Sequence, residues 1–214
     1  MVKEYFYEKT GMYIDWDQLE RLPNVETIID IGIGDIGTQW LWEKYSGKRI
    51  ICIDPLYEAK EVAEKMLKDQ NFSFHQYAVG TSDQNMTINV EKEIGRSTLL
   101  EVTECNFEEN PVEKREIPIK PLDRIIEQAN CEGTYGIKID TEGYELEVIK
   151  SATETLKKTK FVLAEVRHNH NSFKDQYNLG EFMALMQDNG FVPTIIFTAK
   201  PLIADICFQP RLDL

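Results

Sequence analysis

Between residues 28 and 37 the chain reads Ile28-Ile29-Asp30-Ile31-Gly32-Ile33-Gly34-Asp35-Ile36-Gly37, and this segment contains the strongest signal for the fold. Its apolar run predicts a strand, and the three glycines that follow have the spacing G-x-G-x-x-G. Residues 38–45 then read as a helix. A glycine loop between a strand and a helix lets the backbone approach a bound nucleotide. The segment therefore predicts a nucleotide-binding α/β fold.

Two acids make this loop unusual. Asp30 lies two residues before the first glycine, and Asp35 lies inside the loop. The pyrophosphate of NAD is negatively charged and gains nothing from neighbouring carboxylates. S-adenosylmethionine has no phosphate, and its cationic sulfonium and ammonium groups would gain from them. Both cofactors remain candidates from this loop, and the acids favour S-adenosylmethionine.

A third acid, Asp54, directly follows the apolar run Arg49–Ile53. At the end of the second strand of such folds, an acid accepts hydrogen bonds from the ribose hydroxyls of a nucleoside. NAD and S-adenosylmethionine both contain ribose. Asp54 therefore supports nucleoside binding without choosing between the two.

Along the chain, β-branched runs alternate with amphipathic stretches, which is typical of a parallel sheet with crossover helices. Strands are expected near residues 27–31, 49–53, 72–79, 135–139, 161–166, 191–198 and 203–208. Helices are expected near residues 38–45, 58–69, 122–129, 143–157 and 180–188. Residues 1–24 form an aromatic-rich preface, expected on the flank of the sheet or over the cofactor site, and residues 25–214 form a single domain.

Residues 80–121 interrupt this alternation. Short strands are expected there near residues 86–90, 97–102 and 115–119, around an acidic run. The segment is either an insertion that shapes the acceptor site or a plain edge hairpin.

The segment Tyr135–Glu145 reads as a strand that ends in acids and then turns into a helix. Its strand is expected beside the first strand, at the switch point where open α/β sheets bind ligands. Asp140 and Glu142 would then face the reacting group. Complementing the helix N-terminus would account for Glu145, but not for Asp140 at the strand end.

Taken together, these blocks resemble the FkbM family of class I methyltransferases. The resemblance rests on Asp30–Gly37, Ile53-Asp54-Pro55, Ala78-Val79-Gly80, Pro121-Leu122-Asp123 and Lys138–Glu145. It implies a Rossmann-like, seven-stranded, mostly parallel sheet with a reversed last strand and helices on both faces. It also implies S-adenosylmethionine-dependent O-methylation, typically of a sugar in a small molecule, glycan or glycolipid. The cofactor-binding residues it implies are Asp30, Gly32, Gly34, Asp35, Gly37, Thr38, Asp54, Ala78 and Val79. The chain departs from the family at Asp54, where Glu is frequent, and at Gly34-Asp35, which replaces Ala-Asn.

A hydroxyl acceptor needs a general base or a metal ion to activate it. His168 follows the strand near 161–166 and is a candidate base, with Glu165 or Asp140 orienting it. Alternatively, Asp140 and Glu165 could hold a divalent cation such as Mg²⁺. Arg96 and Arg167 are candidate anchors for an acidic acceptor, or ordinary surface arginines.

Composition narrows the function further. The chain has 24 Lys and Arg against 37 Asp and Glu, a net charge of -13, which disfavours nucleic-acid partners. Its apolar runs are too short to span a membrane, its start lacks a signal-peptide pattern, and its four cysteines show no C-x-x-C spacing. A cytoplasmic enzyme is therefore expected.

The rival interpretations of the function are an NAD-dependent oxidoreductase and a catalytically silent cofactor-binding module. The acceptor and any oligomeric state stay open.

Overall fold

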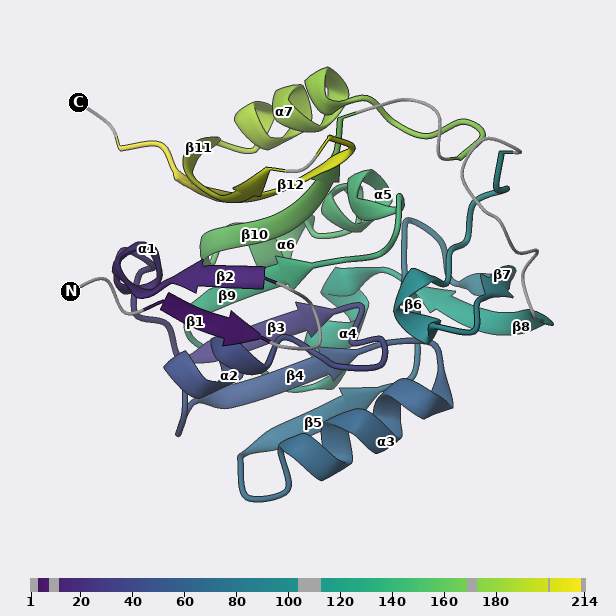
Figure 1. Cartoon of the computed structure of the whole chain (residues 1–214), viewed down its shortest axis with the longest axis horizontal. Helices are drawn as coiled ribbons and strands as arrows, with labels where there is room; N and C mark the ends of the chain where they lie inside the picture. Colours follow the sequence, from purple (N-terminus) through teal and green to yellow (C-terminus); the bar gives the residue numbers. More distant parts are fainter. Residues whose placement is uncertain (1–3, 8–11, 104–112, 169–172, 200, 213–214) are drawn as a thin grey trace.

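The computed structural model describes residues 4–7, 12–103, 113–168, 173–199 and 201–212. Seven strands form the main sheet, in the order β11-β12-β10-β9-β3-β4-β5 (Figure 1). They are β3 (Thr27–Ile31), β4 (Arg49–Ile53), β5 (Phe72–His75), β9 (Tyr135–Ile139), β10 (Thr159–Arg167), β11 (Phe191–Ala199) and β12 (Ile203–Pro210). β12 runs antiparallel to both of its neighbours, whereas β10, β9, β3, β4 and β5 pair in parallel. The expected mostly parallel sheet with a reversed last strand is confirmed.

Helices cover both faces of this sheet. On one face lie α1 (Trp16–Glu20), α2 (Gln39–Lys44) and α3 (Tyr57–Met66). On the other lie α4 (Leu122–Gln128), α5 (Glu145–Lys150), α6 (Thr153–Leu156) and α7 (Leu179–Asp188). Every residue of β3 and β9 is buried as a result, which explains why these strands read as nearly continuous apolar runs. Because side chains alternate along a strand, Ile29 and Ile31 pack on the α4–α7 face while Ile28 and Asp30 point to the α2 face.

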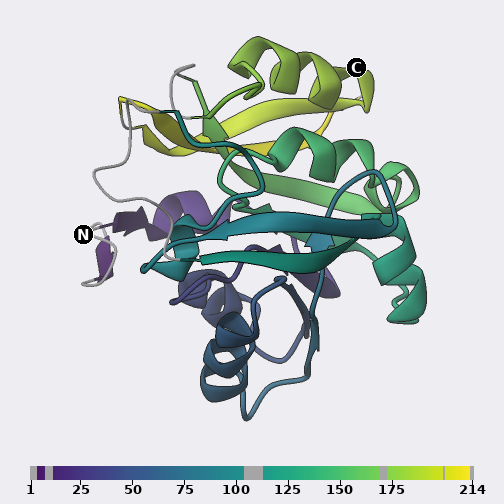
Figure 2. The same cartoon turned by 90° about the vertical axis from the view of Figure 1, so that its right-hand side faces the viewer.

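The insertion folds as a second, three-stranded sheet in the order β6-β8-β7. Its strands are β6 (Ala78–Val79), β7 (Gln84–Val90) and β8 (Glu113–Lys120), and a short 3-10 helix, η1 (Ile94–Arg96), follows β7. This small sheet lies at the carboxyl end of the central strands (Figures 1 and 2). The predicted strand 72–79 is therefore two strands, because the chain leaves the main sheet after β5. Residues 97–102 form only single bridges, at Thr98 and Val102, and the predicted strand there was wrong.

The predicted helix 143–157 is also divided, into α5 and α6. At the break, the carboxylate of Asp123 in α4 accepts hydrogen bonds from the backbone N–H groups of Glu154 (2.9 Å) and Thr155 (2.8 Å). These donors belong to the first turn of α6, so Asp123 caps that helix from a neighbouring element. Both pieces bury apolar side chains in the same core, which is why their spacing resembles that of one helix.

The N-terminal preface begins with a hairpin of β1 (Glu4–Tyr7) and β2 (Met12–Asp15), followed by α1. β2 contacts the edge strand β11, and Leu19 and Leu22 are buried in the core on the α2 face. This part of the chain therefore lies on the flank of the main sheet (Figure 1). Of the described helices, none is long and apolar enough to cross a membrane.

Candidate active site

The glycine loop joins β3 to α2 and is packed tightly against its surroundings. Gly32 has a φ of +84°, and a Cβ there would lie 1.7 Å from the carbonyl oxygen of Asp140. Gly37 has a φ of +64°, and a Cβ there would lie 2.0 Å from the ring of Trp42. Glycine is therefore needed at both positions for the backbone conformation and for space. The loop thus lies directly against the end of β9.

A small, mostly apolar cavity of about 60 Å³ lies on one side of the loop, and we call it the apolar cavity. Its lining includes Ile53, Leu56, Tyr77, Ala78, Val79, Ile88 and Leu99, together with the carboxylate of Asp54. The predicted residues Ala78 and Val79 reach it because β6 leaves the main sheet at this edge. Main sheet and insertion both contribute to this cavity.

Asp54 binds the glycine loop itself. One carboxylate oxygen accepts hydrogen bonds from the backbone N–H of Ile33 (2.9 Å) and Gly34 (3.1 Å), and the other from Leu56 (2.8 Å). Burial raises the pKa of Asp54 to about 6, against the effect of these hydrogen bonds. An ionised carboxylate offers about four acceptor positions. Asp54 therefore orders the loop and keeps capacity for a ligand hydroxyl.

A larger cavity of about 310 Å³ lies on the other side of the loop, and we call it the acidic cavity. Its lining includes Gly37, Thr38 and Trp40, and the charged residues Asp35, Glu93, Arg96, Lys138, Asp140, Glu142, Glu165 and Asp205. Of the described residues, Gly32, Gly34, Gly95 and Asp140 line both cavities. The two cavities therefore meet at the glycine loop, and Asp140 is the charged residue that they share.

Asp30, a predicted cofactor-binding residue, lies behind the glycine loop. It is completely buried and is not among the described lining residues of either cavity. Its carboxylate accepts hydrogen bonds from the indole N–H of Trp42 (2.7 Å) and the hydroxyl of Thr38 (3.2 Å). Burial raises its pKa to about 7. Alternation along β3 points Asp30 at the α2 face, so it supports the loop from behind through Thr38 and Trp42.

Glu145 organises the turn that presents the acids after β9. One of its carboxylate oxygens accepts hydrogen bonds from the N–H and hydroxyl of Thr141 (both 2.9 Å) and the N–H of Gly143 (3.1 Å). Its other oxygen accepts one from the hydroxyl of Tyr177 (2.8 Å). Glu142 adopts a φ of +51° in this turn. The spacing Asp-x-Glu-Gly-x-Glu is therefore that of a turn held by its last residue, and Glu145 does more than complement the helix.

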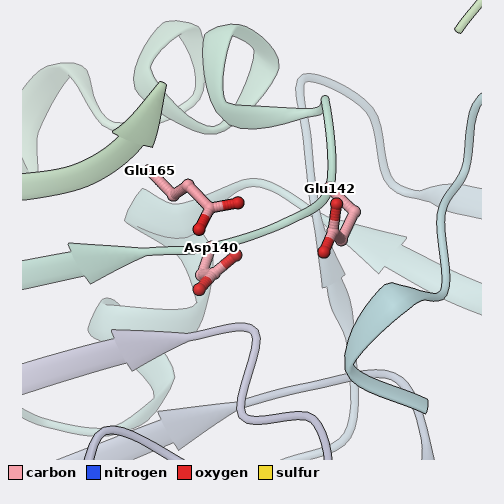
Figure 3. A group of neighbouring side chains, drawn as sticks. All are labelled: Asp140, Glu142 and Glu165. Carbon is pink, nitrogen blue, oxygen red and sulfur yellow. The ribbon is translucent and has the colours of Figure 1, made fainter. Parts of the chain in front are cut away.

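Three carboxylates converge in the acidic cavity (Figure 3). Oxygen atoms of Asp140, Glu142 and Glu165 all lie within 4.8 Å of one another. Asp140 and Glu165 follow from the adjacent ends of β9 and β10, as the sequence predicted. Burial, together with the charge of Asp140, raises the pKa of Glu165 well above its usual range, which favours its protonated form. Glu142 forms an ion pair with Arg167.

Two further charged residues, Lys138 and Asp205, lie beside this cluster. The ammonium group of Lys138 is 3.3 Å from a carboxylate oxygen of Asp140 and 3.7 Å from one of Asp205. Burial lowers the pKa of Lys138, but Asp140 and Asp205 raise it more, so the net direction is upward. Neither residue was among the predicted site residues. The sequence did contain a signal for both, because Lys138 and Asp205 are charged residues within otherwise apolar strands.

The structure does not bring His168 to the cluster. His168 is exposed, its backbone N–H donates to the carbonyl of Leu202 (3.1 Å), and it is not among the described residues that line the acidic cavity. His75 lies in β5, where its ring contacts the hydroxyl of Ser73 (3.2 Å) and burial lowers its pKa. His170 lies outside the described residues.

The two candidate arginine anchors already have acidic partners. Arg96 lies 3.4 Å from a carboxylate oxygen of Glu93, and Arg167 pairs with Glu142. Each positive charge is therefore balanced within the protein, which weakens the case for an acidic acceptor.

The sequence matches the model of the methyltransferase FkbM domain over residues 33–193. Several solved methyltransferases have a similar fold. The ribosomal protein L11 methylase of Lactobacillus delbrueckii subsp. bulgaricus is 10% identical, with a TM-score of 0.50, over 91% of this chain and 74% of that one. A presumed S-adenosylmethionine-dependent methyltransferase from Listeria monocytogenes is 10% identical, with a TM-score of 0.50, over 92% and 98%. Magnesium protoporphyrin IX methyltransferase from Synechocystis PCC 6803, solved with bound S-adenosylmethionine, is 11% identical, with a TM-score of 0.46, over 91% and 74%.

No curated protein matches the chain. The family match nevertheless covers more than half of the 214 residues, and the sheet order and the reversed last strand agree with it. The chain belongs to the FkbM family of S-adenosylmethionine-dependent methyltransferases.

Proposed function

We propose that this enzyme transfers the methyl group of S-adenosylmethionine to a hydroxyl of a sugar, or of a small molecule, glycan or glycolipid that contains one. The observation that carries the proposal is the convergence of Asp140, Glu142 and Glu165 in a cavity beside the glycine loop. Carboxylates accept hydrogen bonds, and a sugar offers several hydroxyl donors. The net charge of -13 supports a small-molecule or glycan acceptor over a nucleic acid.

The residues around the loop fit S-adenosylmethionine. We infer that the apolar cavity takes the nucleoside, with Asp54 accepting from the ribose and Ala78 and Val79 contacting the base. The acidic cavity favours the cationic methionine part, because carboxylates outnumber cationic groups in its lining. In this arrangement Thr38 and the loop backbone contact the cofactor, and Asp30 acts through Thr38. When bound, the cofactor supplies an electrophilic methyl group.

The acceptor hydroxyl must lose a proton to become a good nucleophile. We assign this role to the Asp140–Glu165 pair instead of His168, because both carboxylates line the acidic cavity and His168 is exposed. When two close carboxylates share one proton, their other oxygen atoms can still accept the proton of the acceptor hydroxyl. A neighbouring positive charge favours the ionised state of the pair.

A divalent cation is the second route to an activated hydroxyl. Asp140, Glu142 and Glu165 offer oxygen ligands of the kind that Mg²⁺ prefers. Methyl transfer measured with and without EDTA separates the two routes. Full activity in EDTA supports the carboxylate pair, and activity that returns only on adding Mg²⁺ supports the metal.

We further propose that residues 80–121 select the acceptor. Glu93 and Arg96, which follow β7, line the acidic cavity opposite the main sheet. Exchanging residues 80–121 for the matching segment of a homologue should alter acceptor choice more than cofactor affinity.

Cys52, Cys131 and Cys207 are buried and free, in keeping with a reducing, cytoplasmic location.

The direct test is a screen of sugars, nucleotide sugars and glycolipid fragments with radiolabelled S-adenosylmethionine. We expect a labelled product whose methyl group NMR places on an oxygen atom. A labelled methyl group on nitrogen would support methyltransferase activity but contradict O-methylation. Tight binding of S-adenosylhomocysteine without transfer to any acceptor would favour a catalytically silent module.

Once an acceptor is found, Glu165→Gln tests the carboxylate pair. Glutamine has a similar shape but cannot take up a proton, so we expect turnover to fall by about 100-fold while S-adenosylhomocysteine still binds. His168→Ala is the matched comparison and should keep most of the activity. The opposite result, with turnover lost only in His168→Ala, would restore the histidine as the base.

A further inference from the structure

We propose that Lys138 and Asp205 are positioning residues, which hold the Asp140 carboxylate at the junction of the two cavities. The proposal rests on the cofactor part of the proposed function and is independent of the acceptor. It gives a role to two charged residues that the strand pattern places inside the sheet.

Both residues belong to a polar row on the α2 face of the main sheet. Lys138 of β9 lies beside Asp30 of β3, and Asp205 of β12 lies directly opposite Glu165 of β10. The long side chain of Lys138 therefore reaches across β10, where its ammonium group lies 3.7 Å from Asp205. It joins strands that are not neighbours in the sheet.

This arrangement balances the charges of the row. Two ionised carboxylates opposite each other on antiparallel strands would repel each other, and the ammonium group of Lys138 offsets the charge of Asp205 beside Glu165. The side chains of Lys138 and Asp205 are 5% and 8% exposed, so solvent screens them poorly. The hydroxyl of Thr198 on β11 donates to the second oxygen of Asp205. Asp205 is thus fixed on both sides and in turn fixes the ammonium group.

The pair of Lys138 and Asp205 positions the side chain of Asp140. The ammonium group of Lys138 also donates to the carbonyl of Ile139 (3.1 Å), the residue just before Asp140. Its contact with the Asp140 carboxylate, at 3.3 Å, sets the direction of a side chain that is 35% exposed. Without the ammonium group, this carboxylate could turn away from the junction of the two cavities. Asp140 is the charged residue lining both cavities, so its direction matters for a cation bound across them.

The test compares the affinities of S-adenosylmethionine and S-adenosylhomocysteine, which differ by the methyl group and its positive charge. Calorimetric titration needs no acceptor. In the charge-balanced double variant Lys138→Met with Asp205→Asn, we expect S-adenosylmethionine to bind about tenfold more weakly, while S-adenosylhomocysteine binds nearly as before. Asp140→Asn should show the same loss, and adding it to the double variant should cause little more. Lys150→Met removes an exposed lysine on α5 and should change neither affinity.

Two outcomes overturn the proposal. One is an unchanged preference for S-adenosylmethionine in the folded double variant, and the other is a loss that simply adds to that of Asp140→Asn. Thermal unfolding establishes that each variant is folded. Should the double variant unfold, the single variant Asp205→Asn decides. We expect it to bind S-adenosylmethionine about threefold more weakly, and an unchanged affinity would overturn the proposal. Failure of the wild-type protein to bind either compound would instead refute the cofactor assignment.

Discussion

The apolar cavity and the acidic cavity share the glycine loop but are built from different interactions. In the apolar cavity, the carboxylate of Asp54 receives three backbone N–H groups, and shape is set by buried aliphatic side chains. In the acidic cavity, Asp140, Glu142 and Glu165 lie close together, and Lys138 and Arg167 balance part of their charge. One site is therefore built around local backbone geometry, and the other around charges that distant strands bring together.

Gly32→Ala should break both cavities at once and have the largest effect. The added Cβ would lie 1.7 Å from the carbonyl oxygen of Asp140, so β3 and β9 would have to move apart. We expect a loss of about 3 kcal/mol or more in the free energy of unfolding. Gly47→Ala is the matched control, because Gly47 has a similar φ of +81° with nothing within 4 Å. Urea unfolding measures both, and equal losses would show that close packing is unimportant at Gly32.

Asp54→Asn should affect the apolar cavity most, because Asp54 lines that cavity and holds the glycine loop beside it. The amide offers one acceptor atom where the carboxylate has two, so at least one backbone N–H among Ile33, Gly34 and Leu56 loses its bond. We expect S-adenosylhomocysteine to bind about tenfold more weakly, measured by calorimetry. Asp69→Asn changes the net charge equally at an exposed position and should leave binding unaltered. An affinity in Asp54→Asn equal to wild type would remove this residue from the cofactor site.

Asp30→Asn should change the pH dependence of stability. The buried Asp30 carboxyl has a pKa of about 7, against 3.8 for an ordinary aspartate, so folding takes up a proton between these values. The stability contributed by protonated Asp30 is fully present below pH 3.8 and is lost as the pH rises through 7. The free energy of unfolding should therefore fall with rising pH in wild type, by up to about 1.4 kcal/mol per pH unit from this residue. The variant should show a shallower slope, measured by urea unfolding from pH 5 to pH 7, and an unchanged slope would contradict the raised pKa.

Site residues that follow from short-range spacing could be predicted from the sequence. Gly32, Gly34 and Asp54 follow from spacing between a strand, a loop and the next strand, and such short-range relations can be read directly from sequence. The same is true of Asp140 and Glu165, because parallel strands end at one edge of the sheet. The seven-stranded sheet with its reversed last strand followed from the family resemblance.

The remaining differences arise from relations that cross the sheet. Asp205 meets Lys138 only because β12 runs antiparallel beside β10 in the register Glu165 to Asp205. Asp30 was predicted to bind the cofactor because it lies close to the glycines in sequence. That prediction did not take into account which face of the strand its side chain occupies. His168 was predicted near Asp140 because it follows the same strand as Glu165, yet β10 continues to Arg167 and the histidine is exposed.

The small sheet has a consequence for engineering this enzyme. The strand ends of β9 and β10 and the turn after β9 supply Asp140, Glu142 and Glu165, while the segment after β7 adds Glu93 and Arg96 to the lining of the same cavity. Under the proposed function, acceptor choice and the reaction itself therefore depend on separate stretches of sequence. Homologous segments grafted between β7 and β8 offer a route to new methylated products, and the reacting carboxylates would remain those of the parent.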